Sequence, residues 1–205
     1  MKIGIVADIH EAIEPLRRAL ELFREHGVDH VVNLGDACDI YSASGKAADV
    51  AELLRDAGAV GVWGNHDIGL CHEVSEKIAA NVDAQTLAYM TKMRPFVSMH
   101  DCRFSHVEPW LDAMNYENLW YFEEMPNTPE MAARSFEAVP EHMLFVGHFH
   151  RWLIMTPSGN IDWSADAPLD LDPKTRHLIL VAPVVSGWCV IYDQAESRLI
   201  PLRCD

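Results

Sequence analysis

Apolar runs and segments of helical periodicity alternate along the first third of the chain. Residues 3–7 form a short apolar run, which predicts a buried strand. In the next segment apolar residues recur at helical spacing, with Pro15 near its start and Gly27 at its end, so we expect a helix. The pattern then predicts strands at 28–34 and 59–63 and a second helix at 47–57. This β-α-β-α-β order is typical of a largely parallel sheet with both faces covered.

Short strand-like runs dominate the rest of the chain. Residues 73–93 are expected to be helical, in one piece or two, and residues 164–176 to be a polar loop. Strands are predicted at 96–99, 102–105, 143–146, 152–155, 178–182, 188–192 and 199–202. Turn-forming residues are concentrated at 100–101, 158–160 and 193–197. Because there is no internal repeat and no low-complexity linker, the 205 residues are interpreted as a single domain.

Residues 107–142 differ from their surroundings, being rich in aromatic residues and proline and having no clean period. Thr128 followed by Pro129 is nevertheless typical of a helix start. The aromatic residues of this segment include Trp110, Trp120, Tyr121 and Phe122. Two interpretations stay open. The segment is either a satellite core under a long loop or a cap whose aromatic faces stack on a base, aryl or lipid-like group of a substrate.

The formal net charge of −15 argues against a general binder of nucleic acid or anionic membranes, because affinity for phosphate comes mainly from Lys and Arg. A small phosphoester stays compatible, since bound divalent cations would reverse the charge locally. No apolar run approaches the ~20 residues of a membrane span. The N-terminal apolar run ends at Asp8, too early for a signal peptide. The five cysteines contain no C-x-x-C pair, which indicates reduced thiols, and we expect a cytoplasmic protein.

Metal-binding residue types are concentrated in five short segments, four of which follow a predicted strand. The candidate ligands are Asp8, His10, Asp36, Asn65, His106, His148 and His150. Carboxylate, imidazole and amide oxygen without thiolate form a set suited to Mn, Fe, Zn or Mg rather than to a structural zinc cage. His100 is an alternative to His106, since both lie at an apparent hairpin, but His106 closes a strand and is preferred.

Five motifs, taken in order, carry a resemblance to a known family. They are D-x-H at 8–10, G-D-x-x-D at 35–39, G-N-H-D at 64–67, His106 after a strand, and G-H-x-H at 147–150. In this order and spacing they resemble the calcineurin-like metallophosphoesterase superfamily, although each motif alone is weak. The resemblance implies an α/β fold, a four-layer α/β/β/α sandwich of two mixed β-sheets flanked by helices.

The resemblance also implies two divalent metal ions, most consistent with Mn or Fe and with Zn, Ni or Mg as alternatives. One ion would be held by Asp8, His10, Asp36 and His150, and the other by Asp36, Asn65, His106 and His148, with Asp36 as the bridge. A metal-bridging hydroxide would attack a small phosphomonoester or phosphodiester, and His66 would protonate or stabilise the leaving group. Asp39 would hold the other ring nitrogen of His66 and fix its tautomer.

Departures from the family pattern bear on the substrate. Phosphoprotein phosphatases of the superfamily carry Arg-Gly after G-D-x-x-D, whereas Ile40 and Tyr41 follow Asp39 here. They also usually have Glu at the position of Asp67. A phosphoprotein phosphatase is therefore a less favoured alternative, as is a catalytically silent scaffold, because His66 and all the ligand types are present. The expected partner is a small-molecule phosphoester, and the sequence does not indicate an oligomeric state.

Overall fold

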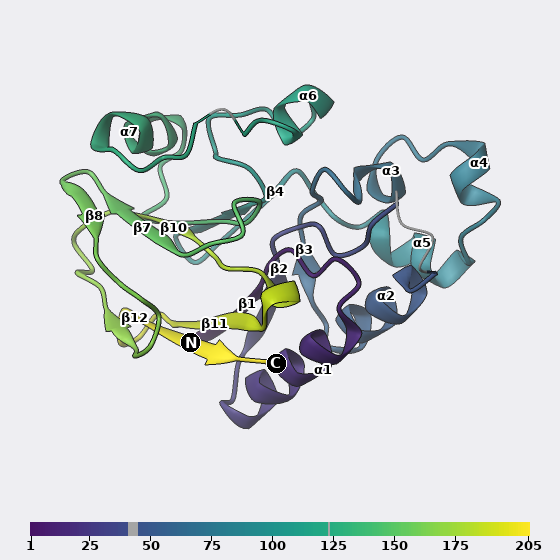
Figure 1. The fold of residues 1–205 in the computed structure, drawn as a ribbon, viewed down its shortest axis with the longest axis horizontal. Coiled ribbons are helices and arrows are strands. Elements are labelled where there is room, and N and C mark those ends of the chain that lie inside the picture. Colours follow the sequence, from purple (N-terminus) through teal and green to yellow (C-terminus); the bar gives the residue numbers. More distant parts are fainter. Residues whose placement is uncertain (41–44, 123) are drawn as a thin grey trace.

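Two six-stranded mixed sheets lie face to face in the computed structural model, which describes residues 1–40, 45–122 and 124–205 (Figure 1). The order of the first sheet is β3-β2-β1-β11-β12-β9. Its strands are β1 (Lys2–Val6), β2 (His30–Asn33), β3 (Val60–Gly61), β9 (Leu169–Asp170), β11 (Trp188–Asp193) and β12 (Arg198–Arg203). The β1, β2 and β3 strands are parallel, and β11 joins β1 in antiparallel pairing.

The second sheet has the order β4-β5-β6-β10-β7-β8. Its strands are β4 (Phe96–Met99), β5 (Cys102–Ser105), β6 (Met143–Val146), β7 (Leu153–Thr156), β8 (Gly159–Ile161) and β10 (His177–Leu180). The central strands β5, β6 and β10 are parallel, and the outer strands are antiparallel to their neighbours. The carboxyl ends of β5 and β6 therefore lie at the same edge of their sheet and can approach the carboxyl ends of β1, β2 and β3.

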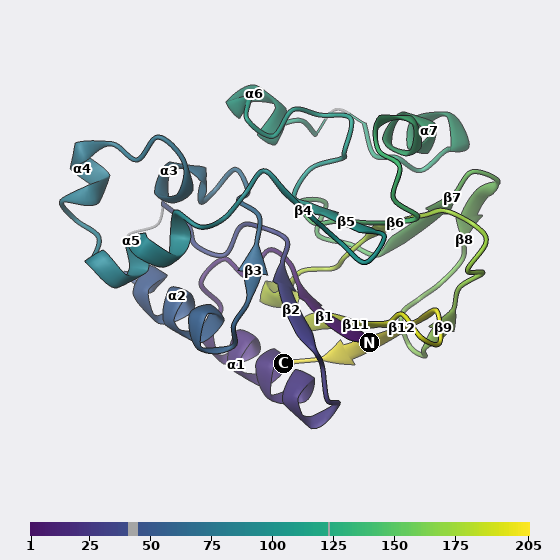
Figure 2. The same ribbon diagram turned by 180° about the vertical axis from the view of Figure 1, so that it is seen from behind.

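Helices cover the outer faces of both sheets and complete four layers (Figures 1 and 2). The helices on the side of the first sheet are α1 (Ile13–Glu25), α2 (Ala47–Asp56), α3 (Ile68–Cys71), α4 (Glu76–Ala79) and α5 (Ala84–Met90). On the side of the second sheet are α6 (Tyr116–Leu119) and α7 (Pro129–Ala138), and a short 3-10 turn, η1 (Val184–Ser186), precedes β11. The expected α/β/β/α sandwich of two mixed sheets is confirmed.

The core follows the alternation of side chains along the strands. Ile3 and Ile5 of β1 point between the sheets, where Phe104 and Phe145 stack with ring centroids 5.3 Å apart. On the opposite face of β1, a Cβ on Gly4 would lie 2.6 Å from the Phe23 ring of α1. Only a glycine lets α1 pack this closely on the sheet. A third cluster, which includes Leu144, Leu178 and Phe136, fills the space between the second sheet and α7.

Four segments differ from the sequence-based expectation. The turn predicted at 158–160 lies at 157–158 instead, because Gly159 already opens β8 and the Thr156 hydroxyl closes a tighter turn by accepting from the Ser158 N–H at 3.2 Å. The predicted loop 164–176 contains β9, which pairs with β12 through Leu169. The short helices α3 and α6 were not predicted, since four residues are too few to show a helical period.

Other expectations are confirmed. Residues 73–93 hold two short helices, α4 and α5. The helix start at Thr128 is also present, with the Thr128 hydroxyl accepting from the Met131 N–H at 3.4 Å. Tyr41, and Glu123 within the segment 107–142, lie outside the described residues. Within the part of the chain that is described, every helix is too short or too polar to cross a membrane.

Candidate metal centre

All the candidate ligands follow the carboxyl ends of parallel strands. Asp8 and His10 come after β1, Asp36 after β2 and Asn65 after β3, while His106 follows β5 and the pair His148 and His150 follows β6. The two sheets converge at this edge, so residues as distant in sequence as 8 and 150 become neighbours. This edge is where open α/β sheets place their ligands.

The loops that carry these residues have an unusual backbone. Five of the candidate ligands have a positive φ, namely Asp8 at 50°, His10 at 44°, Asp36 at 51°, His148 at 67° and His150 at 53°. Such left-handed conformations are uncommon for residues other than glycine and concentrate at functional sites. Hydrogen bonds hold them in place, for example from the Asp8 N–H to the Gly35 carbonyl and from the His10 N–H to the Asp36 carbonyl.

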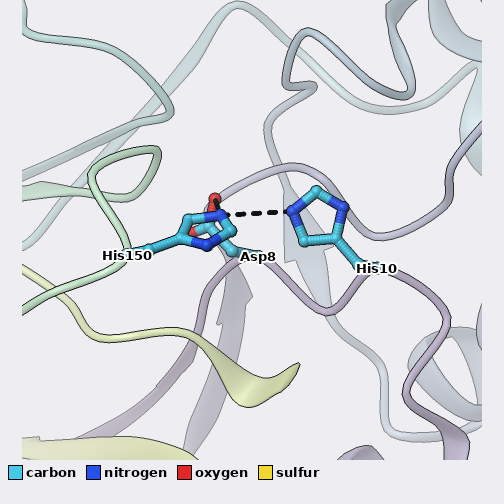
Figure 3. A group of neighbouring side chains, drawn as sticks. All are labelled: Asp8, His10 and His150. Carbon is cyan, nitrogen blue, oxygen red and sulfur yellow. Dashed lines mark hydrogen bonds and ion pairs between the residues drawn. The ribbon is translucent and has the colours of Figure 1, made fainter. Parts of the chain in front are cut away.

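One cluster of side chains joins Asp8, His10 and His150 (Figure 3). The Nε2 atoms of His10 and His150 lie 3.2 Å apart, and His150 Nε2 is 3.4 Å from Asp8 Oδ1. His10 Nε2 also lies 3.7 Å from Oδ2 of Asp36. Four donor groups thus face a common point.

A second cluster lies deeper and is buried. His106 Nε2 lies 2.9 Å from Asn65 Oδ1 and 3.1 Å from His148 Nδ1, and the last two atoms are 3.2 Å apart. His106 Nε2 is also 3.4 Å from Asp36 Oδ2. The same oxygen of Asp36 therefore faces both clusters.

The donor spacing fits divalent cations. Ligands ~2.1 Å from an ion and at right angles to each other lie about 3 Å apart, and the spacings in both clusters range from 2.9 to 3.7 Å. Each cluster therefore has the donor set and spacing for one ion.

The surroundings fix which atom each imidazole presents. His106 Nδ1 donates to the Leu34 carbonyl at 2.8 Å, so in the neutral ring Nε2 carries the lone pair that can bind a metal. His148 is held in the opposite sense, with Nε2 donating to the Tyr121 carbonyl at 3.1 Å and Nδ1 facing the cluster. Partners of this kind orient metal-binding histidines.

The buried groups of the site create an environment that favours a positive charge. Burial lowers the pKa of His148 to about 3 and keeps its ring neutral, which is the form that binds metals. Burial opposes the charged form of Asp36, but His106 and the His66 N–H hold the pKa of that carboxyl below its ordinary value. In the same way, burial lowers the pKa of His106, but Asp36 outweighs burial and raises it to about 9. A divalent cation at this point would supply the charge that the buried Asp36 requires.

The family model of the calcineurin-like phosphoesterase superfamily domain matches residues 1–163 of the 205. This chain belongs to that superfamily. The superfamily is one of metal-dependent phosphoesterases, in agreement with the convergent donors of the two clusters.

Known proteins similar to this phosphoesterase include two from Methanocaldococcus jannaschii. The uncharacterized protein MJ0912 is 23% identical over 219 residues, covering 99% of this chain and 87% of the relative. Phosphodiesterase MJ0936 is 29% identical over 72 residues, or 35% of this chain and 39% of the relative. The crystal structure of a metallophosphoesterase from Sphaerobacter thermophilus has a TM-score of 0.76 and 22% identity, covering 99% of this chain and 88% of that one. The last comparison shows the shared fold.

The remaining residues proposed from the sequence lie beside the clusters of this phosphoesterase. His66 Nδ1 is 3.2 Å from Asp39 Oδ1, and the His66 ring lies 4.8 Å from that of His10. The alternative ligand His100 is at the other end of β5, beside His30 with centroids 5.8 Å apart. The structure therefore brings His106, and not His100, to the other candidates.

Asp67 has a structural role that sequence reasoning missed. Its carboxylate is buried and accepts from the Ala37 N–H at 2.7 Å and from the Gly64 N–H at 2.6 Å. It thereby ties together the loops after β2 and β3, which carry Asp36 and Asn65. The only signal in the sequence was its departure from Glu in the third motif, and that signal did not reveal the contact.

The aromatic segment reaches the site. A pocket of about 410 Å³ is lined by ligand candidates and by Phe122, Met125, Phe149 and Arg151. Leu119 of the same segment is fully buried in the core. The segment thus combines core packing with side chains at the mouth of the site. Arg151 was missed because it belongs to no motif, although it directly follows the last one.

Proposed function

We propose that this protein is a binuclear metallohydrolase of small phosphomonoesters or phosphodiesters. The observation that carries the proposal is the position of Asp36 Oδ2, which lies 3.7 Å from His10 Nε2 and 3.4 Å from His106 Nε2. A carboxylate oxygen shared between two donor clusters suits a bridge between two cations.

Each of the two clusters of donor side chains would bind one ion. Asp8, His10, Asp36 and His150 would hold one ion, and Asp36, Asn65, His106 and His148 the other. When bound, the two ions activate water for in-line attack and neutralise charge on the phosphoryl oxygens. Mn and Fe suit these ligands best, with Zn, Ni and Mg as alternatives.

His66 would act on the leaving group. Asp39 faces His66 Nδ1 at 3.2 Å, so the proton available for transfer is the one on Nε2. From there His66 can protonate the departing alkoxide or stabilise its charge. Arg151, which lines the same pocket, would add positive charge for the phosphoryl group in a chain of net charge −15.

A small substrate is favoured by the size of the site. The pocket of about 410 Å³ lies within the range of small-molecule sites, roughly 300–1,000 Å³. The acidic balance of the chain disfavours nucleic acid. Location in the cytoplasm stays a prediction from composition.

The test is hydrolysis of an aryl phosphomonoester and a bis-aryl phosphodiester by metal-stripped protein titrated with Mn²⁺. Turnover should appear only with metal and saturate at two ions per chain. His10→Ala and His148→Ala should each lose one ion, while Asp36→Asn weakens both. His142→Ala, which changes an exposed histidine paired with Asp101, is the matched control. Two bound ions without turnover would favour the silent scaffold, and no metal binding would overturn the proposal.

A further inference from the structure

Three aromatic side chains stand exposed beside the site. Tyr116, Trp120 and Phe122, which we call the aromatic shelf, are 50%, 37% and 56% exposed, respectively. Exposure of an aromatic ring to water costs free energy. A single exposed ring is common, but a group of exposed rings beside a pocket is typical of a binding surface.

The shelf is continuous with the catalytic groups. The Phe122 ring stacks on His148 with centroids 4.0 Å apart and planes at 19°. The Trp120 ring lies 5.3 Å from the ring of His66, and Tyr116 extends the row with its centroid 6.2 Å from that of Trp120. A group attached to a phosphoryl at the metal ligands would therefore reach these rings directly.

The residues on both sides of Trp120 in the chain are packed into the fold. Leu119 is fully buried, and the Tyr121 carbonyl accepts from His148. The Tyr121 ring packs edge-on against Trp110 at 5.6 Å, and Trp110 in turn donates to the buried Glu108 at 3.1 Å. Since the chain on both sides of Trp120 is anchored, binding of a ligand would cost less in ordering of this segment.

The geometry points to a phosphoester whose alcohol part carries a flat aromatic ring. We propose that Trp120 and Phe122 stack on that ring while the clusters hold the phosphoryl group, and this rests on the function proposed above. Aryl alcohols and nucleosides share this chemistry. Stacking is favoured over simple apolar burial because Trp120 and Phe122 present planar faces next to a polar, charged site.

The first experiment compares phenylphosphonate with cyclohexylphosphonate by calorimetry on the Mn²⁺-loaded protein. The two ligands are similar in size and are not hydrolysed, and only one has an aromatic face. We expect phenylphosphonate to bind roughly three- to tenfold more tightly, the range of an aromatic pair. Phe122→Leu and Trp120→Leu should each reduce that preference. Phe96→Leu, a 44% exposed phenylalanine on β4, should keep it.

Metal content is measured for every variant, because Phe122 touches a proposed ligand. A variant that keeps two ions and loses the preference supports stacking. Equal binding of the two phosphonates by the wild type, or a preference that survives both leucine variants, would overturn the inference while phosphoester turnover stands. If neither phosphonate nor inorganic phosphate binds and there is no turnover, the proposed function fails and this inference fails with it.

A second arm separates the two sources of the ring. The methylphosphonate analogues of adenosine and cytidine 5′-monophosphates, which are not hydrolysed, are compared with that of ribose 5-phosphate in the same way. Binding that is tighter for the nucleotides, and lost in Trp120→Leu, assigns the ring to a nucleoside. Nucleotides that bind no better than ribose 5-phosphate, together with a phenyl preference, assign it to an aryl alcohol.

Discussion

The conformation of individual residues at the site carries a cost that the rest of the fold compensates. Five candidate ligands hold φ between 44° and 67°, which costs each L-residue about 1–2 kcal/mol. Buried hydrogen bonds compensate this strain. Both oxygens of Asp8 accept from the His148 N–H at 3.0 and 3.1 Å, and Asp36 Oδ1 accepts from the His66 N–H at 2.9 Å.

Asp67→Ala tests the tie between the loops after β2 and β3. The substitution leaves the buried N–H groups of Ala37 and Gly64 without their acceptor, at about 1–3 kcal/mol each. We expect the free energy of unfolding, measured in urea with a chelator present, to fall by about 2–5 kcal/mol. Asp67→Asn keeps one acceptor oxygen and should lose less. A change within the error of the measurement for Asp67→Ala would contradict this role.

His66→Ala tests the proposed leaving-group role. Because His66 lies beside the clusters and not among the proposed ligands, kcat should fall by roughly 10²–10⁴ while metal content is unchanged. Asp39→Asn keeps the shape of the side chain facing Nδ1 and should reduce kcat less. Loss of an ion in His66→Ala would make His66 a ligand instead, in line with its grouping with His10 and Asp39.

At the scale of elements, the site depends on how closely the strand-end loops approach each other. Gly35 has φ +93°, and a Cβ there would lie 2.7 Å from His106 Nδ1. A Cβ on Gly64 would overlap the carboxylate of Asp36. The loops after β2, β3 and β5 therefore pack at backbone distance, which brings Asp36 and His106 within reach of one cation.

Gly64→Ala should therefore displace Asp36. We expect at least a tenfold loss of metal affinity, on the order seen when groups that orient ligands are changed, and about 1–3 kcal/mol of lost stability from overpacking. Metal titration by calorimetry and urea unfolding measure the two effects. In the control Gly69→Ala, the new Cβ meets only the δ-methyl groups of Ile40 and Ile78, at 3.0 and 3.4 Å. Equal metal affinity in both variants would show that the loops can move apart.

At the scale of the whole molecule, the candidate ligands lie at one edge of the sandwich, and a buried histidine lies at the opposite edge. His177 begins β10 opposite Met143, at the end of that strand away from His148. It is 1% exposed. Burial lowers the pKa of His177. A buried neutral histidine of this kind makes stability depend on pH without taking part in catalysis.

The expected pH dependence follows from the direction of that shift. Since the folded-state pKa of His177 lies below its ordinary value of 6.5, the unfolded chain takes up the proton first as pH falls. The wild type therefore has the full contribution of neutral His177 to the free energy of unfolding above about pH 6.5, and it loses this contribution as the pH falls below that value. In His177→Gln that loss is absent, so the gap in unfolding free energy between the two proteins should narrow from pH 7.5 to pH 5. Urea unfolding in chelator measures it, and a constant or widening gap would contradict the prediction.

The sequence by itself determined which residues could carry the chemistry and the order of most elements. The apolar runs predicted the strands, and five motifs at strand ends predicted one set of ligand types, because parallel strands bring their carboxyl ends to the same edge. Short elements such as α3 and β9 were missed, since two to four residues show no period.

Only the tertiary structure decided which candidates meet. It separated His106 from His100 by placing them at opposite ends of β5, and it gave Asp67 its two backbone partners. It also placed Phe122 on His148 and Trp120 beside His66, neither of which has a local signal. The physical reason is that contacts at the site join distant segments, up to the 140 residues that separate His10 from His150. Local propensity fixes where a strand ends, whereas the packing of two sheets fixes what that end faces.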